Sequence, residues 1–490
     1  MMSKYDLSHT GTLSRASFYL PFNSANLNPH EFDKTYLSEF DYFPVISSLK
    51  VFNLDTALLF KKLNSTMPSI YFESNSGSNS YSIIATQTNC SCASLHNLED
   101  LRNFVNSTRV PPLDFPFFTG GLIGFWSYDL GLKLLDLPEK SSPTIPKQYF
   151  FMPQEVIVYD KKAQILTIVV WANCKNINDF TLANIHQRLE DIKKLAISLE
   201  NQDYALNITS TFNETNNFSV NISDGEFCTM IKRAQEYISK GEIFQIVLSR
   251  CWKKDSPAEP EDVFQRLRQV NPSPYMFFVK LPDLILIGAS PETQVVVQDR
   301  NVLVSPIAGT RKICGNKTLD LKAAQELLTD EKELAEHIML VDLSRNELSR
   351  VSKPGTVQVE EMFRLKYFSN VVHLVSTIKG TLRDNHDSLE AFKSCFPAGT
   401  LSGAPKNRAM EIISELEPMS RGAYGGAVGY IDFNGNIDSC IIIRTALYKD
   451  GEYIIQSGAG IVADSDPEKE CLETFYKARA LMTTIQAVEE

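Results

Sequence analysis

Hydrophobic and polar positions alternate most regularly in the second half of the chain, where they predict both helices and strands. Residues 225–240 have the spacing of an amphipathic helix, and residues 242–249 have that of a strand. Residues 323–350 predict one long helix with an apolar face. Residues 405–416 predict another helix, opened by Pro405, because proline is favoured in a first helical turn.

The C-terminal pattern predicts three consecutive strands followed by a helix. Apolar runs at 424–433, 439–448 and 452–462 are separated by short turns of Asn, Asp and Gly, so we expect an antiparallel meander. Asp466 and Pro467 are typical of the start of a helix. Helices and antiparallel strands in separate blocks favour an α+β fold.

The first half of the chain gives a weaker pattern. Short apolar runs between turns predict strands within residues 43–90, and residues 180–199 have helical spacing. Residues 201–224 are polar, rich in Asn and Thr and poor in charge, which is typical of a linker. We therefore expect an N-terminal region over residues 1–200 and a second domain over residues 225–486.

Charge and composition argue against several classes of partner. The 490 residues carry a net charge of −11, which disfavours nucleic acid or an anionic membrane as the main partner. No apolar run is long enough for a transmembrane helix, and residues 1–20 lack the apolar core of a signal peptide. The nine cysteines have neither disulfide-framework nor zinc-site spacing. We therefore expect a cytoplasmic protein.

Two pairs of glutamates are spaced for a metal site on helices. Glu333 and Glu336 lie three residues apart in the long helix, and Glu470 and Glu473 repeat this spacing in the last helix. If the pairs face each other, their carboxylates would form an oxygen cage suited to a hard cation such as Mg²⁺. The alternative is a solvated helix face, with Glu333 as the partner of a helix cap at Asp330.

Other chemically active residues lie in apolar surroundings. Arg444 interrupts an apolar strand pattern, so its guanidinium needs either a substrate carboxylate or a structural acid. The glycines of residues 458–460 could bring backbone N–H groups to an anion, or form an ordinary turn. His373 is either a core residue or a general base that faces a cleft. Glu292 could take part in catalysis, or it could simply be a surface charge at the edge of a strand.

Five longer motifs, taken in order, resemble the chorismate-binding enzyme family. They are Ser305 to Arg311 (SPIAGTR), Ala335 to Asn346, Pro397 to Lys406 (PAGTLSGAPK), Tyr424 to Tyr430 (YGGAVGY) and Gly458 to Ser465 (GAGIVADS). The resemblance is dense over residues 225–485 and thin before them. It implies large antiparallel β-sheets packed as a sandwich with helices outside, and an active site in the C-terminal region.

The resemblance also implies a role for each candidate residue. Glu336 and Glu473 look like Mg²⁺ ligands, with Glu333 and Glu470 in support. The binders of a chorismate carboxylate and ring would be Arg444, Tyr424, Gly458, Ala459, Gly460, Gly309 and Thr310. His373 resembles the catalytic base and Thr400 its neighbour at the reacting centre. Glu292 resembles the general acid that protonates the departing C4 hydroxyl.

Two positions discriminate among the family's reactions. Members that add water have a lysine where this chain has Gln245, and many aminodeoxychorismate synthases have a nucleophilic lysine where it has Ala308. The resemblance therefore favours anthranilate synthase, a lyase that converts chorismate and ammonia to anthranilate and pyruvate. Residues 118–131 are more similar to component I of aminodeoxychorismate synthase, which stays the alternative. The third possible function is that of a non-catalytic protein with the same fold that binds an aromatic acid.

The remaining resemblances concern regulation and the source of ammonia. Residues 43–45, 71–74 and 271–276 resemble the segments of a tryptophan feedback pocket, in which Ser74, Pro274, Tyr275 and Met276 would hold L-tryptophan. No glutaminase signature of a nucleophilic cysteine with paired His and Glu is visible. We therefore expect a separate glutamine amidotransferase subunit to supply ammonia.

Overall fold

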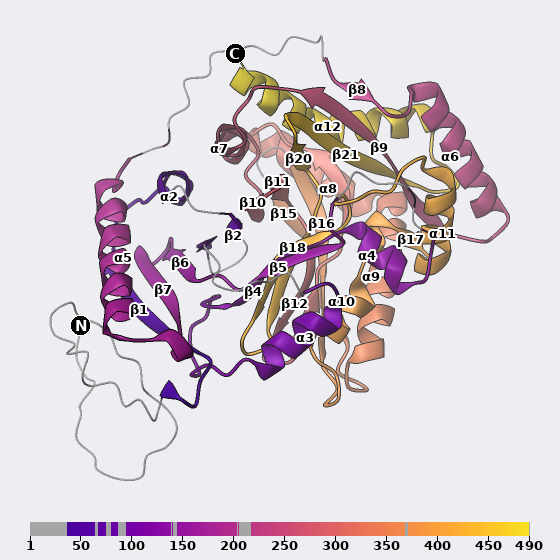
Figure 1. Cartoon of the computed structure of the whole chain (residues 1–490). Coiled ribbons are helices and arrows are strands. Elements are labelled where there is room, and N and C mark those ends of the chain that lie inside the picture. The colour runs from indigo at the N-terminus through magenta and orange to yellow at the C-terminus, as the bar shows by residue number, and fades with distance from the viewer. Residues whose placement is uncertain are drawn as a thin grey trace.

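Two antiparallel sheets form the centre of the molecule. The computed structural model describes residues 37–63, 67–74, 80–86, 95–138, 140, 145–202, 204, 217–367 and 371–489. In this part of the chain the longer sheet has 12 strands and the shorter one has nine. Figure 1 shows the N-terminal strands at one end of the molecule and the C-terminal strands at the other.

Every strand pair in both sheets is antiparallel. The longer sheet runs in the order β1 (Tyr42–Lys50), β7 (Ile165–Asn173), β6 (Glu155–Asp160), β3 (Tyr81–Thr86), β2 (Ser69–Ser74), β10 (Tyr275–Lys280), β11 (Ile285–Ser290), β20 (Thr445–Lys449), β21 (Glu452–Ile461), β9 (Gln245–Asp255) and β17 (Gly403–Ala404), with β8 (Ser219–Val220) paired to β9. The shorter sheet runs in the order β14 (Ile307–Lys312), β16 (Val371–Thr381), β13 (Asn301–Val304), β12 (Thr293–Gln298), β19 (Ile437–Ile441), β18 (Ala427–Asp432), β4 (Gly121–Trp126) and β5 (Gln148–Phe151), with β15 (Gln358–Tyr367) paired to β16.

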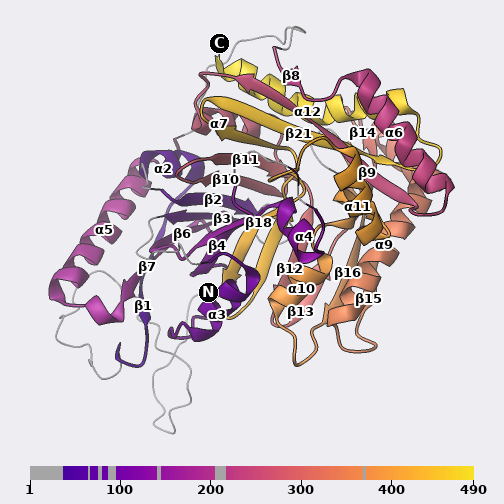
Figure 2. The ribbon, with the colours of Figure 1, turned by 45° about the vertical axis from the view of Figure 1, so that its right-hand side comes forward.

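Helices pack against both sheets. Those that pack with the longer sheet are α2 (Thr56–Leu63), α5 (Asp179–Ser198), α6 (Asp224–Ser239), α7 (Pro260–Val270), α11 (Lys406–Leu416) and α12 (Pro467–Glu489). Those that pack with the shorter sheet are α3 (Leu98–Ser107), α8 (Lys317–Thr329), α9 (Glu331–Val351) and α10 (Ser388–Cys395). The helix α4 (Tyr128–Leu134) follows β4, and the short turns η3 (Cys174–Asn176) and η4 (Gly399–Leu401) complete the elements. The expected α+β sandwich with outer helices is confirmed (Figure 2).

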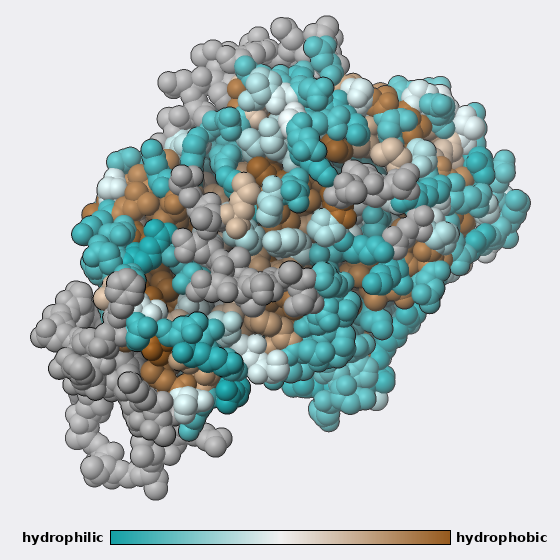
Figure 3. Space-filling model, in the orientation of Figure 1, coloured by the Kyte–Doolittle hydropathy of each residue, from teal (hydrophilic) through white to brown (hydrophobic). Residues whose placement is uncertain are grey.

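Side-chain alternation along the strands explains the layered core. In β2, Ile70 and Phe72 belong to the cluster that joins the two sheets, whereas Tyr71 belongs to the cluster under α2, α5 and α7. Successive side chains of a strand point to opposite faces, so a strand that is buried on both faces is apolar throughout. On the face drawn in Figure 3, hydrophilic residues predominate and apolar ones form scattered patches.

The single helix expected over residues 323–350 is wrong, because α8 and α9 meet at Asp330. The Asp330 side chain accepts hydrogen bonds from the backbone N–H groups of Lys332 at 3.1 Å and Glu333 at 3.2 Å. A carboxylate in this position caps a new helix. The hydrophobic spacing continues across the break, which is why periodicity alone did not find it.

The expected meander is also wrong, because the predicted strand at 439–448 is two strands in different sheets. β19 ends at Ile441 in the shorter sheet, and β20 begins at Thr445 in the longer one. Between them Arg444 has a φ of 50°, a left-handed conformation that non-glycine residues rarely adopt. The chain therefore crosses from one sheet to the other within residues 442–444.

The proposed regions 1–200 and 225–486 share both sheets. β1, β2, β3, β6 and β7 extend the longer sheet, and β4 and β5 extend the shorter one. The division stays a prediction, and most of the expected linker, residues 203 and 205–216, lies outside the described residues. Among the described helices, none is long and apolar enough to cross a membrane.

Candidate functional site

A bulge in β14 places His373 beside Gly309 and Thr310. Thr310 is opposite His373 in the β14–β16 pairing, whose register shifts between Ala308 and Thr310, and Gly309 has a φ of 68°. The His373 Nδ1 atom lies 3.0 Å from the Gly309 carbonyl oxygen and 3.0 Å from the Thr310 hydroxyl. A carbonyl can only accept, so Nδ1 carries the proton and the lone pair is on Nε2. Burial lowers the pKa of His373, which favours the neutral, basic form.

Glu292 and Thr400 meet directly before the first residue of β12. Glu292 follows β11 and is buried, and the Thr400 hydroxyl of η4 donates a hydrogen bond to its Oε1 at 2.8 Å. Burial raises the pKa of Glu292 to about 7, although the bond from Thr400 lowers it. A carboxyl group with that pKa is protonated often enough at neutral pH to act as an acid.

Arg444 lies in the crossing between the sheets without a carboxylate partner. Its guanidinium makes no hydrogen bond or ion pair that involves another described residue. Burial lowers its pKa, and the nearby Tyr424 and Glu473 oppose that effect, yet an arginine stays charged in a protein. A Cβ atom built on Gly458 would lie 2.8 Å from the Tyr424 hydroxyl, so this phenol and the β21 backbone are adjacent. These groups can receive an anion.

The two glutamate pairs approach each other across α9 and α12. Burial raises the pKa of Glu336, and the charges of Glu333, Glu470 and Glu473 raise it further. Burial also raises the pKa of Glu470, together with the charge of Glu473. Carboxylates that disfavour one another's ionisation in this way suit a divalent cation, which would stabilise their charged forms.

Each of these carboxylates also has a partner within the chain. The contacts are Arg311 to Glu333 at 3.0 Å, Lys332 to Glu336 at 3.9 Å, Ser465 to Glu470 at 2.9 Å, and Lys477 to Glu473 at 2.6 Å. Across the described residues, no group of three or more His, Cys, Asp or Glu side chains is compact enough to hold a metal ion as it stands. Metal ligation by the four glutamates therefore stays a prediction, supported by donor type and proximity.

Gln245 lies beside the glycine-rich strand β21. A Cβ atom built on Gly460 would lie 2.9 Å from Gln245 Nε2, so this side chain is adjacent to the 458–460 backbone. The Ala459 side chain is fully buried in the core with Ile246 and Leu248, which leaves only its backbone available to a ligand.

Three of the four residues expected to bind an inhibitor line a large cavity between the sheets. Ser74, Pro274 and Tyr275 border a cavity of about 640 Å³, whose walls come from both sheets. Met276 instead packs on the other face of the longer sheet, with Tyr71 and Phe278. Its side chain therefore points away from this cavity, because neighbouring residues of a strand alternate.

Comparisons with known proteins agree on one family. The model of the chorismate binding enzyme family matches residues 67–483. The chain belongs to this family. The anthranilate synthase component 1 of Acetivibrio thermocellus is 42% identical over 381 residues, 77% of each chain, and that of Aquifex aeolicus is 42% identical over 379 residues, 76% of each chain.

Solved structures of the family confirm the fold. Anthranilate synthase component I from Streptococcus pneumoniae superposes with a TM-score of 0.69 and 31% identity, over 90% of this chain and 92% of that one. The menaquinone-specific isochorismate synthase from Escherichia coli gives a TM-score of 0.70 at 19% identity, over 92% and 97% of the two chains. At that identity the second likeness concerns the fold alone.

Lys477 is a member of the site that the sequence analysis missed. Its Nζ atom donates a hydrogen bond to the Gly458 carbonyl at 2.9 Å and lies 2.6 Å from Glu473. Its charge also lowers the pKa values of Glu292 and His373, so it lies near both. The available signal was its position four residues after Glu473 on the last helix, which places both on one face.

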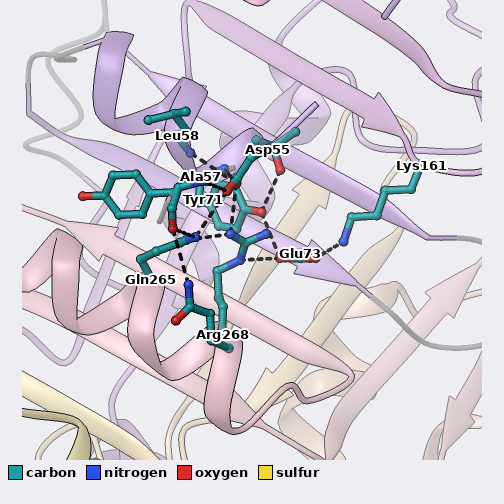
Figure 4. Close-up of polar contacts among 11 residues, drawn as sticks. Asp55, Ala57, Leu58, Tyr71, Glu73, Lys161, Gln265 and Arg268 are labelled. Atoms are coloured by element: carbon teal, nitrogen blue, oxygen red, sulfur yellow. Dashed lines mark hydrogen bonds and ion pairs between the residues drawn. The ribbon is translucent and has the colours of Figure 1, made fainter. Parts of the chain in front are cut away.

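A network of charged side chains surrounds Glu73 of β2, the residue next to Ser74. In Figure 4, Arg268 of α7 reaches Glu73 of β2 at 3.2 Å and Asp55, just before α2, at 3.1 Å. Lys161 forms a second ion pair with Glu73, and the Tyr71 hydroxyl donates to Glu73 at 2.9 Å. The network joins elements of the first 161 residues to α7, directly before the segment that contains Pro274 and Tyr275.

Proposed function

We propose that this chain is the chorismate-converting component of an anthranilate synthase, which acts in aromatic amino acid biosynthesis. The observation that carries the proposal is a buried acid, Glu292, and a half-buried base, His373, both with a pKa that the charge of Lys477 lowers. Relatives named anthranilate synthase component 1, about 40% identical over most of the chain, support the choice among the family's reactions.

Substrate binding follows from the charges of the site. Chorismate is a dianion, and the unpartnered Arg444 offers a fork of donors to one carboxylate. Tyr424 and the backbone of residues 458–460 complete that end of the site. Glu333, Glu336, Glu470 and Glu473 would hold Mg²⁺, which when bound would offset the charge of the second carboxylate.

The reaction then needs an acid before it needs a base. Ammonia adds at C2 while the C4 hydroxyl leaves, and Glu292 gives that hydroxyl a proton so that it departs as water. His373 Nε2 next removes the C2 proton, and loss of the pyruvyl group leaves an aromatic ring. Gln245 has no basic lone pair with which to deprotonate water, so this position supports ammonia as the nucleophile.

Other parts of the proposal extend beyond the catalytic groups. Ammonia would come from a glutamine amidotransferase subunit, since the chain has no glutaminase signature. The 640 Å³ cavity with Ser74, Pro274 and Tyr275 would bind L-tryptophan as a feedback inhibitor. The cytoplasm would be the site of action.

Anthranilate fluorescence tests the proposal directly. The pure chain should form anthranilate from chorismate, ammonium and Mg²⁺, and should form none from glutamine without the partner subunit. Chromatography of the product separates the alternative, because aminodeoxychorismate synthase component I would give 4-amino-4-deoxychorismate. A chain that uses glutamine unaided would contradict the proposed division of labour.

A further inference from the structure

Glu292 lines a small cavity that is separate from the positions of His373 and Arg444. A cavity of about 30 Å³ is lined by Glu292 and Thr400 on one side and by residues of β12, α9 and α10 on the others. His373, Arg444 and Gly458 do not line it. Glu292 therefore belongs to a small space beneath α9 as well as to the group of residues around Lys477.

This small space has the size and the polarity of a water site. A single buried water needs roughly 10–15 Å³, with two to four polar partners. Gln294 Oε1 in its wall is buried and has no hydrogen-bond partner among the described residues, while Nε2 of the same side chain donates to the Cys395 carbonyl at 2.9 Å. Ser305 and Ser344 add hydroxyl groups to the lining and are only half-buried.

Glu347 makes the far end of this space polar as well. It is 6% exposed, lines the cavity, and lies 2.6 Å from Lys406 Nζ. A buried carboxylate without further polar partners is unfavourable, so water beside this ion pair would stabilise it. The acceptor of Gln294 and the carboxylate of Glu347 both favour water over an apolar occupant.

Water in this cavity could serve to reprotonate Glu292 after each reaction cycle. Each turnover transfers the Glu292 proton to the departing hydroxyl, and the ammonia that adds at C2 releases a proton on the other side of the ring. The Glu292 carboxylate must regain a proton before the next cycle, while substrate or product fills the space on its own side.

We propose that water in the cavity beneath α9 returns the proton to Glu292. The water takes a proton from solvent at the Ser344 side and passes one to the Glu292 carboxylate, so only O–H bonds form and break. Gln294 Oε1 anchors this water, and Glu347 polarises the far end. The inference rests on the proposed acid role of Glu292, and it assigns positioning roles to Gln294 and Ser344.

Filling the cavity from its half-buried side tests the proposal. Ser344→Val should lower kcat about tenfold, less than the roughly 100- to 10,000-fold that a general acid contributes. The ratio kcat/KM for chorismate should stay within about twofold, so that KM falls together with kcat, because proton return follows the steps from substrate binding to the first irreversible step. The solvent deuterium isotope effect on kcat should increase, since proton return becomes slower than the other steps. Ser349→Val, on the exposed face of the same helix, is the matched control.

A second variant and a crystal structure test the same proposal independently of Ser344→Val. If Ser344→Val does not fold, Gln294→Met removes the anchor at similar volume and should give the same kinetic pattern. A crystal structure of the unaltered chain should show ordered water at hydrogen-bond distance from Gln294 Oε1. A dry cavity, or an unchanged isotope effect in a folded Ser344→Val chain, overturns the inference. Absence of anthranilate formation by the unaltered chain would count against the proposed function, while the crystallographic water is read independently of it.

Discussion

At the residue scale, Glu292 controls the pH dependence that we expect. Its pKa is raised to about 7 by burial, so the acid form decreases as the pH rises through that value. At a fixed concentration of free ammonia, kcat/KM for chorismate should therefore fall above about pH 7. Glu292→Gln should remove this limb and lower kcat by roughly 100-fold or more. A limb that persists in the glutamine variant would assign the titration to another group.

Arg444 gives the second prediction at this scale. Arg444→Met should lower kcat/KM by about 100-fold, equivalent to about 2.7 kcal/mol, because a chorismate carboxylate loses its charged partner. The thermal midpoint should not fall, since the substitution removes a half-buried charge that has no ion-pair partner among the described residues. Arg444→Lys keeps the charge without the planar fork, and should lie between the two in activity. A marked loss of stability in the methionine variant would indicate a structural role instead.

Single residues also show what the sequence could and could not reveal. The glutamate spacing and the isolated Arg444 were visible in the sequence because local pattern determines them. The involvement of Lys477 depends on how α12 meets β21, and the raised pKa of Glu292 depends on its burial near residues of β12, α9 and η4. Both are properties of packing between segments that are far apart in the chain, which composition and periodicity do not encode.

At the scale of elements, the break between α8 and α9 orients the first glutamate pair. Asp330 caps α9 and also lies 2.6 Å from Arg311, which contacts Glu333 at 3.0 Å. Asp330→Ala should destabilise the fold by about 1 kcal/mol, a typical loss for a helix cap. It should also raise the Mg²⁺ concentration needed for half-maximal activity, because Arg311 is then free to pair with Glu333 more strongly. Urea unfolding and Mg²⁺ titration measure the two effects.

The cap of α8 supplies the control for this prediction. The Asn316 side chain accepts hydrogen bonds from Thr318 and Leu319 at the start of α8. Asn316→Ala should lose a similar amount of stability and leave the Mg²⁺ requirement unchanged. Equal effects of both variants on Mg²⁺ would show that the break at Asp330 has no special relation to the glutamates.

Element positions were predicted better than element partners. Helices over 225–240 and 180–199 and strands within 43–90 correspond to α6, α5, β1, β2 and β3. The meander was wrong because an apolar run with short turns looks the same whether the chain returns to its own sheet or crosses to another. Pairing of β2 with β10 joins residues about 200 positions apart in the sequence, and no local signal specifies it.

At the scale of the whole molecule, the network around Arg268 links the two halves of the chain. Arg268→Met should reduce the free energy of unfolding by about 3 kcal/mol, the lower end for breaking a buried pair, because Lys161 still contacts Glu73. Arg266→Met on the same helix should change it by less than about 0.5 kcal/mol, since the one side-chain contact of Arg266 within the described part of the chain is an exposed one with Gln269. Guanidinium-induced unfolding of both variants decides the point. Equal small changes would show that the network around Arg268 contributes little to the attachment of the two halves.

The chain passes from β19 in the shorter sheet to β20 in the longer sheet at Arg444, so the two layers are joined at the candidate site. Three residues bridge the layers there, and a fully extended trio spans only about 10 Å. The layers cannot separate there without breaking strand pairing, and the three residues between β5 and β6 tie the two sheets together in the same way. Any change in the volume of the cavity between the sheets must therefore be taken up within the sheets themselves, because separation of the layers is prevented at both places.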